Sequence, residues 1–275
     1  TIPVGVSTIN SYAFQGCSSL PNIYIPDTVT TIGNNAFQGC TSLTSITIPV
    51  GVSTINSYAF QGCTILSSVT IPFGVTAINS YAFQGCTSLS SITTPDSVIS
   101  IGSGAFRDCS SLENVALNEN LVSIKNEAFQ RCVVLETISI PSTVRDVGDD
   151  AFNYCTELRE ITFEGPPPAI SIYDLNQYRV SPTMYYKVSP LSWEVYVTPY
   201  APYLVYLGPP TIQVQPQNAI AAVGDSIRLS VEATDVKETA LSYQWLCNGI
   251  ELSGETAATL SLDSVTQSDV GNYQV

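Results

Sequence analysis

The stretch TIPVGVSTINSYAFQGC, residues 1 to 17, decides the fold because it returns without one change at residues 47 to 63. A third version, TIPFGVTAINSYAFQGC, fills residues 70 to 86 with three substitutions. The copies are displaced by 46 and then by 23 residues, so the underlying unit is 23 residues long. Self-similarity at a fixed period of this length predicts a chain built from stacked repeats.

Cysteines mark the register of the repeat, because they recur every 23 residues with no insertion. The seven positions are Cys17, Cys40, Cys63, Cys86, Cys109, Cys132 and Cys155. A phenylalanine stands three residues before each cysteine, at Phe14, Phe37, Phe60, Phe83, Phe106, Phe129 and Phe152. Written once, the unit reads L-x-x-I-x-I-P-x-x-V-x-x-I-G/N-x-x-A-F-x-x-C-x-x.

Two periodicities within the unit predict its local structure. Apolar and polar residues alternate in Ile46-Thr47-Ile48, which is typical of a short strand with one buried face. Between Ala36 and Leu43 the apolar residues follow a spacing of 1, 4 and 7, which predicts a short helical turn. Each unit should therefore run through a strand, a proline turn, an extended connector and a helical turn. Since 23 residues cannot enclose a core, neighbouring copies must cover one another.

The repeat resembles the BspA-like leucine-rich repeat over residues 1 to about 163, with almost every signature position filled. The resemblance implies an α/β leucine-rich-repeat solenoid with a parallel sheet on its concave face and short helical turns. It also implies a secreted or cell-surface protein, since several members of the family are adhesins. Thr94, Asn118 and Lys125 depart from the strand isoleucine, the proline and the glycine of the unit, and they predict an irregularity near the fifth and sixth coils.

The cysteine and phenylalanine columns are interpreted as structural core. Stacked strands lie about 4.7 to 4.9 Å apart, whereas the Cβ atoms of a disulfide lie about 3.8 Å apart. The chain has no histidine, and a straight column offers no converging zinc ligands. We therefore expect buried, reduced thiols and no metal, and we expect native thiol labelling to reach Cys247 at most.

Residues 164–210 are expected to form a closing cap and linker, because EGPPPAI at 164 to 170 interrupts the repeat. The segment resembles the closing part of related arrays, in which a Tyr-Tyr strand such as Tyr185-Tyr186 and a following tryptophan such as Trp193 cover the last coil. An aromatic ligand site that adds Tyr196 and Tyr200 remains the alternative.

Residues 211–275 predict an incomplete all-β immunoglobulin-like sandwich, because short strand-like runs alternate with turn residues. Trp245 and Tyr273 resemble the core tryptophan and the corner tyrosine of such domains. The usual disulfide positions hold Val231 and Val275, so Cys247 should be unpaired. At 65 residues, the segment is expected to lack its last strand.

Charge and composition exclude several functions. The net charge is -14, and residues 1 to 106 hold only Asp27 and Asp96 as charged side chains, so a nucleic-acid partner is not expected. No apolar run is long enough to span a bilayer. Without histidine or a nucleophile motif, no enzyme and no cofactor are predicted. The acidic group at Asp146, Asp149 and Asp150 is interpreted as a solvated loop, with a calcium site as the alternative.

A binding role is the main functional hypothesis. The polar strand positions should point to the concave side and recognise an extracellular protein or glycan. These positions are Asn22, Tyr24, Ser45, Thr47, Ser68, Thr70, Ser91, Thr93, Asn114, Ser139, Glu160 and Thr162. The alternative is a structural spacer without a dedicated ligand, which the near-identical early repeats favour. Side chains that differ between repeats on the concave face would favour binding.

Overall fold

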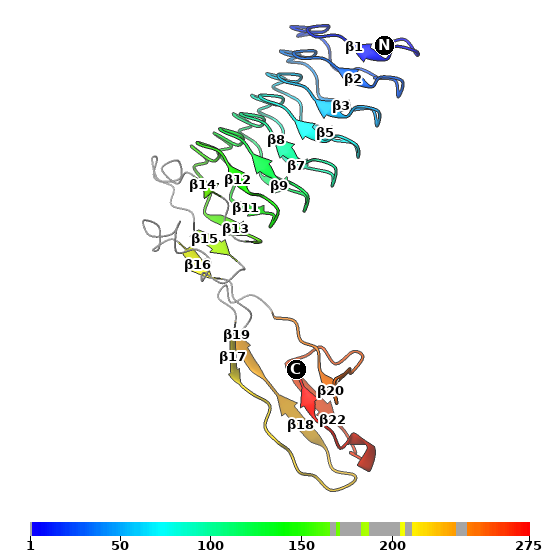
Figure 1. The fold of residues 1–275 in the computed structure, drawn as a ribbon, viewed down its shortest axis with the longest axis vertical. Helices are drawn as coiled ribbons and strands as arrows, with labels where there is room; N and C mark the ends of the chain where they lie inside the picture. The colour runs from blue at the N-terminus through cyan, green and yellow to red at the C-terminus, as the bar shows by residue number, and fades with distance from the viewer. Residues whose placement is uncertain (1, 166–168, 171–182, 187–203, 207–210, 235–240) are drawn as a thin grey trace. The chain divides into compact units, whose positions relative to one another are not determined.

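The computed structural model describes residues 2–165, 169–170, 183–186, 204–206, 211–234 and 241–275. Two compact units divide the chain, Thr1–Val205 and Tyr206–Val275. The first unit is a stack of similar coils, one for each 23-residue repeat (Figure 1). We number these coils one to seven by their cysteines, from Cys17 to Cys155.

The predicted strands form one side of the stack, which we call the first strand column. Its strands pair in parallel at the repeat offset, as Ile46 with Val69 and Ile138 with Ile161 show. They are β3 (Ser45–Thr47), β5 (Ser68–Thr70), β7 (Ser91–Thr93), β9 (Asn114–Ala116), β11 (Thr137–Ile140), β13 (Glu160–Phe163), β15 (Thr183–Tyr186) and β16 (Leu204–Tyr206). β15 pairs with β13 in parallel, so the 23-residue register continues past the seventh coil.

The extended connectors form a second strand column, which the sequence pattern did not indicate as a sheet. Its strands are β1 (Thr8–Ile9), β2 (Thr31–Ile32), β4 (Thr54–Ile55), β6 (Ala77–Ile78), β8 (Ser100–Ile101), β10 (Ser123–Ile124), β12 (Asp146–Val147) and β14 (Ala169–Ile170). β4 to β14 make one six-stranded parallel sheet. From β1 to β12 the buried isoleucine or valine of this column points into the coil, so two columns of parallel strands enclose the core.

A tight turn replaces the expected helical turn in each coil. The backbone N–H groups alternate between two kinds of partner: Gln38 N–H donates to Asn35 O within the coil at 3.2 Å, while Phe37 N–H donates to Ala59 O of the next coil at 2.8 Å. Asn35 and Gly39 have φ values of 59° and 71°, and these left-handed residues prevent a continuous helix. Among the described residues, the one helix is the short 3₁₀ helix η3 (Gln267–Asp269) in the second unit.

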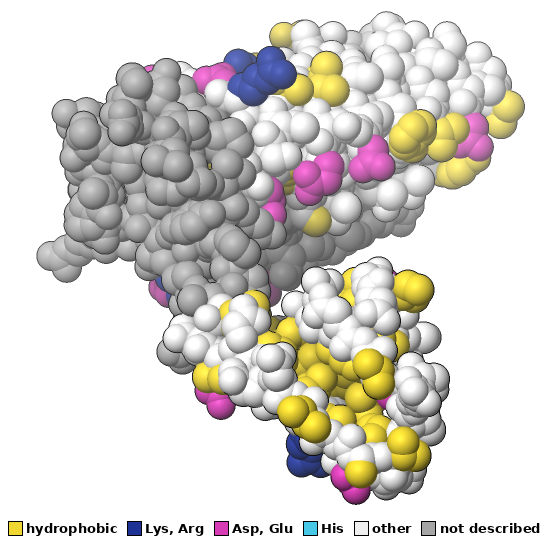
Figure 2. Space-filling view, turned by 60° about the horizontal axis from the view of Figure 1, so that its bottom comes forward, with side chains coloured by type: hydrophobic (Ala, Val, Ile, Leu, Met, Phe, Trp, Pro, Cys, Tyr) yellow, Lys and Arg dark blue, Asp and Glu magenta, His cyan; other side chains and the backbone are white. Residues whose placement is uncertain are grey.

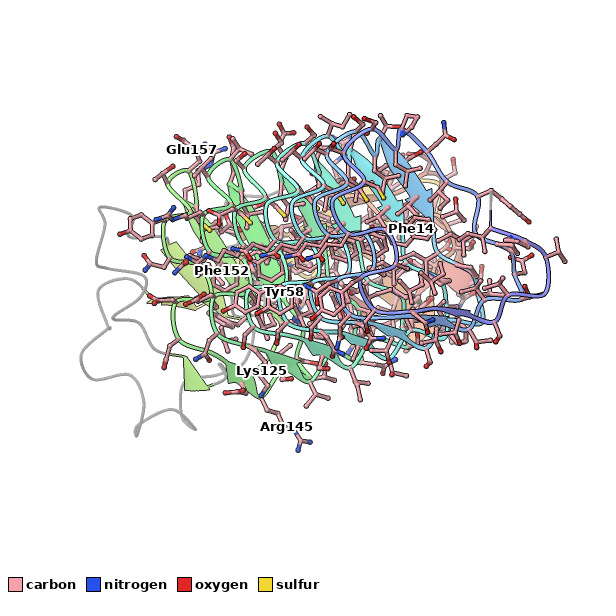
Figure 3. All side chains as sticks on the ribbon, turned by 90° about the horizontal axis from the view of Figure 1, so that it is seen from above. Phe14, Tyr58, Lys125, Arg145, Phe152 and Glu157 are labelled. Atoms are coloured by element: carbon pink, nitrogen blue, oxygen red, sulfur yellow. The ribbon has the colours of Figure 1, made fainter. Side chains whose placement is uncertain are left out.

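Stacked phenylalanine rings fill the centre of the coils. Neighbouring rings lie nearly parallel with centroids 5.1 to 5.6 Å apart, from Phe14 through to Phe152. Figure 3 shows both of these side chains inside the stack, with a row of sulfur atoms beside the rings. Phe37, Phe60 and Phe83 are fully buried. Phe14 is only half-buried, because a ring stacks on one of its sides.

The predicted irregularity is a pair of compensating substitutions. Thr94 and Asn118 are both buried polar residues, and they lie in adjacent coils. The Thr94 hydroxyl accepts hydrogen bonds from the Asn118 backbone N–H and from its side-chain amide, each at 3.0 Å. The Asn118 amide also donates to Val98 O, so each departure satisfies the polar groups of the other. The third departure, Lys125, forms an ion pair with Asp146 at 2.8 Å.

The second unit consists of antiparallel strand pairs. β17 (Thr211–Val214) pairs with β19 (Glu232–Thr234), and β18 (Ile227–Ser230) pairs with β22 (Thr259–Leu262). β20 (Leu246–Cys247) pairs with both β21 (Ile250–Glu251) and β23 (Tyr273–Gln274).

Trp245 is the centre of the core of this unit. It is fully buried, and its indole N–H donates to Ala257 O at 2.9 Å. Val231 and Val275, which stand at the usual disulfide positions, both pack in this core. Tyr273 packs against it while its hydroxyl donates to Asp269 O at 2.8 Å. The hydrogen bond fixes the tyrosine at the end of the sandwich, in the manner expected of a corner tyrosine.

Candidate functional site

The outward side chains of β3 to β13 in the first strand column, with those of the matching segment of the first coil, form a continuous polar surface that we call the strand face. Alternation along each strand places serine and threonine outside and isoleucine or valine inside. Ten of the twelve predicted binding positions are exposed: Asn22, Tyr24, Ser45, Thr47, Ser68, Thr70, Ser91, Thr93, Asn114 and Ser139. Glu160 and Thr162 are half-buried, and the Thr162 hydroxyl donates to the Glu160 carboxylate at 3.1 Å.

Three exposed residues of this region were missing from the predicted set. Ala116 and Thr137 occupy the same strand positions as Thr93 and Asn114, and Glu113 directly precedes β9. The unit itself could have identified the first two, because they lie 23 residues after predicted positions. Alanine was left out of a set chosen for polarity, although the missing hydroxyl changes the shape of the surface.

A shallow hollow of about 330 Å³ interrupts the strand face at β7, β9 and β11. Buried Ile92 and Ile138 and half-buried Val115 form its apolar floor, while Asn114 and Thr137 are among the polar residues around it. β7 pairs with β9 and β11 pairs with β13, but β9 and β11 belong to separate sheets. β5 and β7 also belong to separate sheets, so this break in pairing is not specific to the hollow.

Charge around the hollow is acidic. Glu113 lines it, and no ion pair joins Glu113 to any residue that the structure describes. The next acid along the same edge, Glu136, is already paired with Arg159. Ser139, which also lines the hollow, donates its hydroxyl proton to Glu164 at 2.6 Å. A ligand group in the hollow would therefore meet hydroxyls, an amide and an uncompensated carboxylate.

Six cysteines are held as buried thiols in the core. Each Sγ lies 3.1 to 3.3 Å from the carbonyl oxygen of the phenylalanine in the preceding coil, as in Cys63 with Phe37. Burial raises the pKa of Cys40 to about 11 and the pKa of Cys63 and Cys155 to about 12. Because the reactive thiolate is disfavoured, these cysteines are unsuited to nucleophilic or redox chemistry.

Cys17 contradicts the expectation that all seven cysteines of the column are buried. It is exposed and lies in the first of the coils that the structure describes. Cys247 is half-buried. Native labelling should therefore reach Cys17 as well as Cys247.

The metal alternative finds no support in the part of the chain that the structure describes. No group of three or more cysteine or acidic side chains there could hold a metal ion. Of the acidic group, Asp146 pairs with Lys125, and the Asp150 carboxylate accepts a hydrogen bond from Asn153. The described residues contain no helix that could cross a membrane.

The aromatic alternative lies mostly outside the described residues. Tyr185 and Tyr186 belong to β15, which pairs with the strand of the seventh coil. Trp193, Tyr196 and Tyr200 lie outside the residues that the structure describes.

The second unit has a larger hollow of about 690 Å³, lined by both apolar and polar residues. Ile227, Leu229 and Leu262 contribute from the two paired strands, and Val223 and Val270 from the loops. Figure 2 shows hydrophobic side chains gathered in this hollow.

Comparisons with known proteins define the class. The model of the BspA type leucine rich repeat region matches residues 1–93 and 76–177 in six copies, and the model of the immunoglobulin domain matches residues 209–275. The chain belongs to the BspA type leucine rich repeat family, and it carries an immunoglobulin-like domain after the repeats.

Two solved structures of bacterial proteins are similar to this chain. A leucine rich cell surface protein from Faecalibacterium prausnitzii is 37% identical with a TM-score of 0.54, and the match covers 62% of this chain and 47% of that one. The leucine rich repeat protein of T. pallidum is 36% identical with a TM-score of 0.54, and the match covers 56% of this chain and 72% of that one. This chain thus spans about half the length of the Faecalibacterium protein. No match was found among curated proteins.

Proposed function

We propose that this chain is an extracellular or cell-surface binding protein that recognises a protein or glycan partner through the strand face and catalyses no reaction. The observation that carries the proposal is the strand face itself. Its exposed hydroxyl and amide side chains stand in parallel rows on strands whose inner residues are locked in the core. Solenoids use extended surfaces of this kind to bind partners. The similarity to a bacterial cell surface protein supports the proposed location.

Differences between coils also favour binding over a spacer. A spacer needs no particular side chain on any coil, so its substitutions should scatter over the whole surface. Here several differences fall on the strand face, where Tyr24, Asn114, Ala116 and Glu160 interrupt rows of serine and threonine. The identity of residues 1–17 and 47–63 is the observation that favours the spacer.

A triple substitution tests the proposal. Thr47, Thr70 and Thr93 are exposed, so changing all three to lysine should leave the fold intact while placing bulk and charge along the strand face. Binding should be measured on immobilised extracellular matrix proteins and on a glycan array, with circular dichroism as the check of folding. We expect the triple variant to lose at least tenfold in binding relative to the parent.

The matched control carries lysine at Thr30, Ser53 and Thr76, which are exposed outside the first strand column. It adds the same charge, so it should bind as the parent does. Equal binding by the parent and the strand-face variant would reject the proposal in favour of the spacer.

A further inference from the structure

At the hollow formed by β7, β9 and β11, the strand face departs from its own repeat at two positions. In coils two to four, Thr47, Thr70 and Thr93 occupy one row, and Ala116 follows them in the fifth coil. The residue before each strand is Thr44, Ser67 or Ser90 in those coils, but Glu113 in the fifth. The same coil therefore loses a side chain from the surface and gains a negative charge beside the space.

We propose that this hollow receives the side chain of a lysine or arginine from an extended segment of a protein partner, with Glu113 as the counter-charge. The inference rests on the proposed function, because it names the chemical group that the strand face would recognise. It assigns a specific role to a carboxylate that was absent from the predicted set of binding residues.

The size and lining of the hollow fit such a side chain. Its volume of about 330 Å³ suits one long side chain rather than a whole folded element. The apolar floor of Ile92, Val115 and Ile138 would cover the methylene groups, while the charged end stays at the polar edge. Asn114 and Thr137 supply oxygen atoms that can accept hydrogen bonds from an ammonium or a guanidinium group.

The distribution of charge favours a cation over a neutral sugar. Glu113 is exposed at the hollow, and no lysine or arginine is among the lining residues. The net charge of -14 attracts cationic partners at long range. No aromatic side chain lines the hollow to stack on a sugar ring. The pairing of Glu136 with Arg159 leaves Glu113 as the acid available to a ligand at this place.

Short peptides test the proposal with the full chain. The probe is an acetylated and amidated nine-residue peptide of glycine and serine with one central lysine, and the comparison peptides carry norleucine or glutamate instead. Binding is followed by NMR through the methyl signals of Ala116 and Ile138, which line the hollow. We expect the lysine peptide to shift both signals, the other two peptides to bind at least fivefold more weakly, and 0.5 M NaCl to weaken the lysine peptide severalfold.

Two variants and a control locate the effect. Glu113→Gln should weaken the lysine peptide at least fivefold, and Ala116→Thr should do the same by restoring the side chain that the other coils have. Glu157→Gln removes an equal charge from an exposed residue outside the lining and at an edge of the coils (Figure 3), so it should change nothing.

Other outcomes overturn the proposal. If the norleucine peptide binds as tightly as the lysine peptide, or if a neutral oligosaccharide shifts the two methyl signals and the lysine peptide does not, the hollow does not receive a cation. Full binding of matrix partners by Glu113→Gln, together with loss of binding by the triple lysine variant, would reject the role of the hollow and leave the proposed function standing.

Discussion

The early coils, two to four, and the late coils, five to seven, hold the same backbone with different side chains. Phe37 N–H in the second coil and Phe106 N–H in the fifth each donate to the next coil at 2.8 Å. In addition to these backbone hydrogen bonds, the early coils carry a row of hydrogen-bonded glutamines, such as Gln61 and Gln84 at 2.6 Å. The late coils carry ion pairs instead, such as Arg107 with Glu127. The buried core and the backbone hydrogen bonds between coils are therefore the same in both regions, whereas the exposed side chains at the edge of the coils differ.

The two regions also differ in which residues occupy the second left-handed position of the turn. The early coils place Gly39, Gly62 and Gly85 there, all with a φ of 71°. The late coils place non-glycine residues at the same position, Arg131 and Tyr154 among them, each with a φ of 61°. A left-handed conformation costs a residue with a Cβ atom roughly 1 to 2 kcal/mol. At this position the late coils carry conformational strain that the early coils avoid, although both regions hold other non-glycine residues in the left-handed conformation, such as Asn35 and Glu127.

Alkaline pH should lower the free energy of unfolding of both regions together. We expect this loss to be larger than that of any substitution proposed below. Burial holds the pKa values of these thiols above the ordinary value of a cysteine, so the unfolded state releases protons first as the pH rises. The stability from these thiols is present below pH 9 and is lost as the pH rises toward the folded values. Because six buried thiols lose this contribution together, the loss at pH 10 should exceed that of any single substitution below.

Urea unfolding followed by circular dichroism between pH 7.5 and pH 10.5, with reductant present, measures this loss. A Cys86→Ala variant should show a pH dependence smaller by about one sixth, since it removes one of six buried thiols. Constant stability up to pH 10 would show that the thiols are hydrated.

Truncation of the ring column should cost the same in both regions. Phe83→Ala in the fourth coil and Phe129→Ala in the sixth should each lower the free energy of unfolding by about 3 to 5 kcal/mol, because both rings are fully buried between two stacked neighbours. Tyr81→Ala is the control, with an expected loss of about 1 kcal/mol, since this ring is only half-buried. Chemical denaturation measures all three, and equal losses at Phe83 and Tyr81 would contradict the assignment of inside and outside.

The Thr94–Asn118 pair lies where the two regions meet, and the two substitutions should be coupled. Thr94→Ile removes the acceptor of two Asn118 N–H groups, which should cost about 1 to 3 kcal/mol. Adding Asn118→Pro restores the pattern of the other coils and should recover most of the loss. A double-mutant cycle in urea should give a coupling energy of at least about 1 kcal/mol, and additive losses would show that the two residues act independently.

Substitutions at the left-handed position should have opposite signs in the two regions. Gly85→Ala should cost about 1 kcal/mol through its φ alone, since a Cβ atom there would lie 3.8 Å from its nearest neighbours. Arg131→Gly should gain up to about 1 kcal/mol by relieving the strain. Thermal unfolding midpoints measure both changes, and a loss of stability in both variants would remove the distinction between the regions.

The 23-residue period predicted much of the fold. In every unit, apolar and polar residues alternate at the same strand positions, and a cysteine stands at the same place. The strand positions and the ring column follow directly from that register. The turn was interpreted as helical because its apolar spacing is also that of a helix, whereas Gly16, Gly39, Gly62 and Gly85 were the available signal for left-handed residues.

Contacts between coils were harder to predict, because the sequence does not show which atoms face one another across the stack. Thr94 and Asn118 were recognised as separate departures, although their separation of 24 residues is one more than the period and places them beside each other. Most of the strand face was predictable, but the hollow depends on how the side chains of β7, β9 and β11 lie across the stack, including the small side chain of Ala116.

Thiol labelling is the most direct test of the central claim, which is that early and late coils form one continuous stack with a shared buried core. The full chain is treated with iodoacetamide under native reducing conditions and again in denaturant, and the modified cysteines are identified by mass spectrometry. We expect native modification of exposed Cys17 and half-buried Cys247 alone, with protection of Cys40, Cys63, Cys86, Cys109, Cys132 and Cys155 until the chain unfolds. Rapid native modification of several of these six cysteines would contradict it.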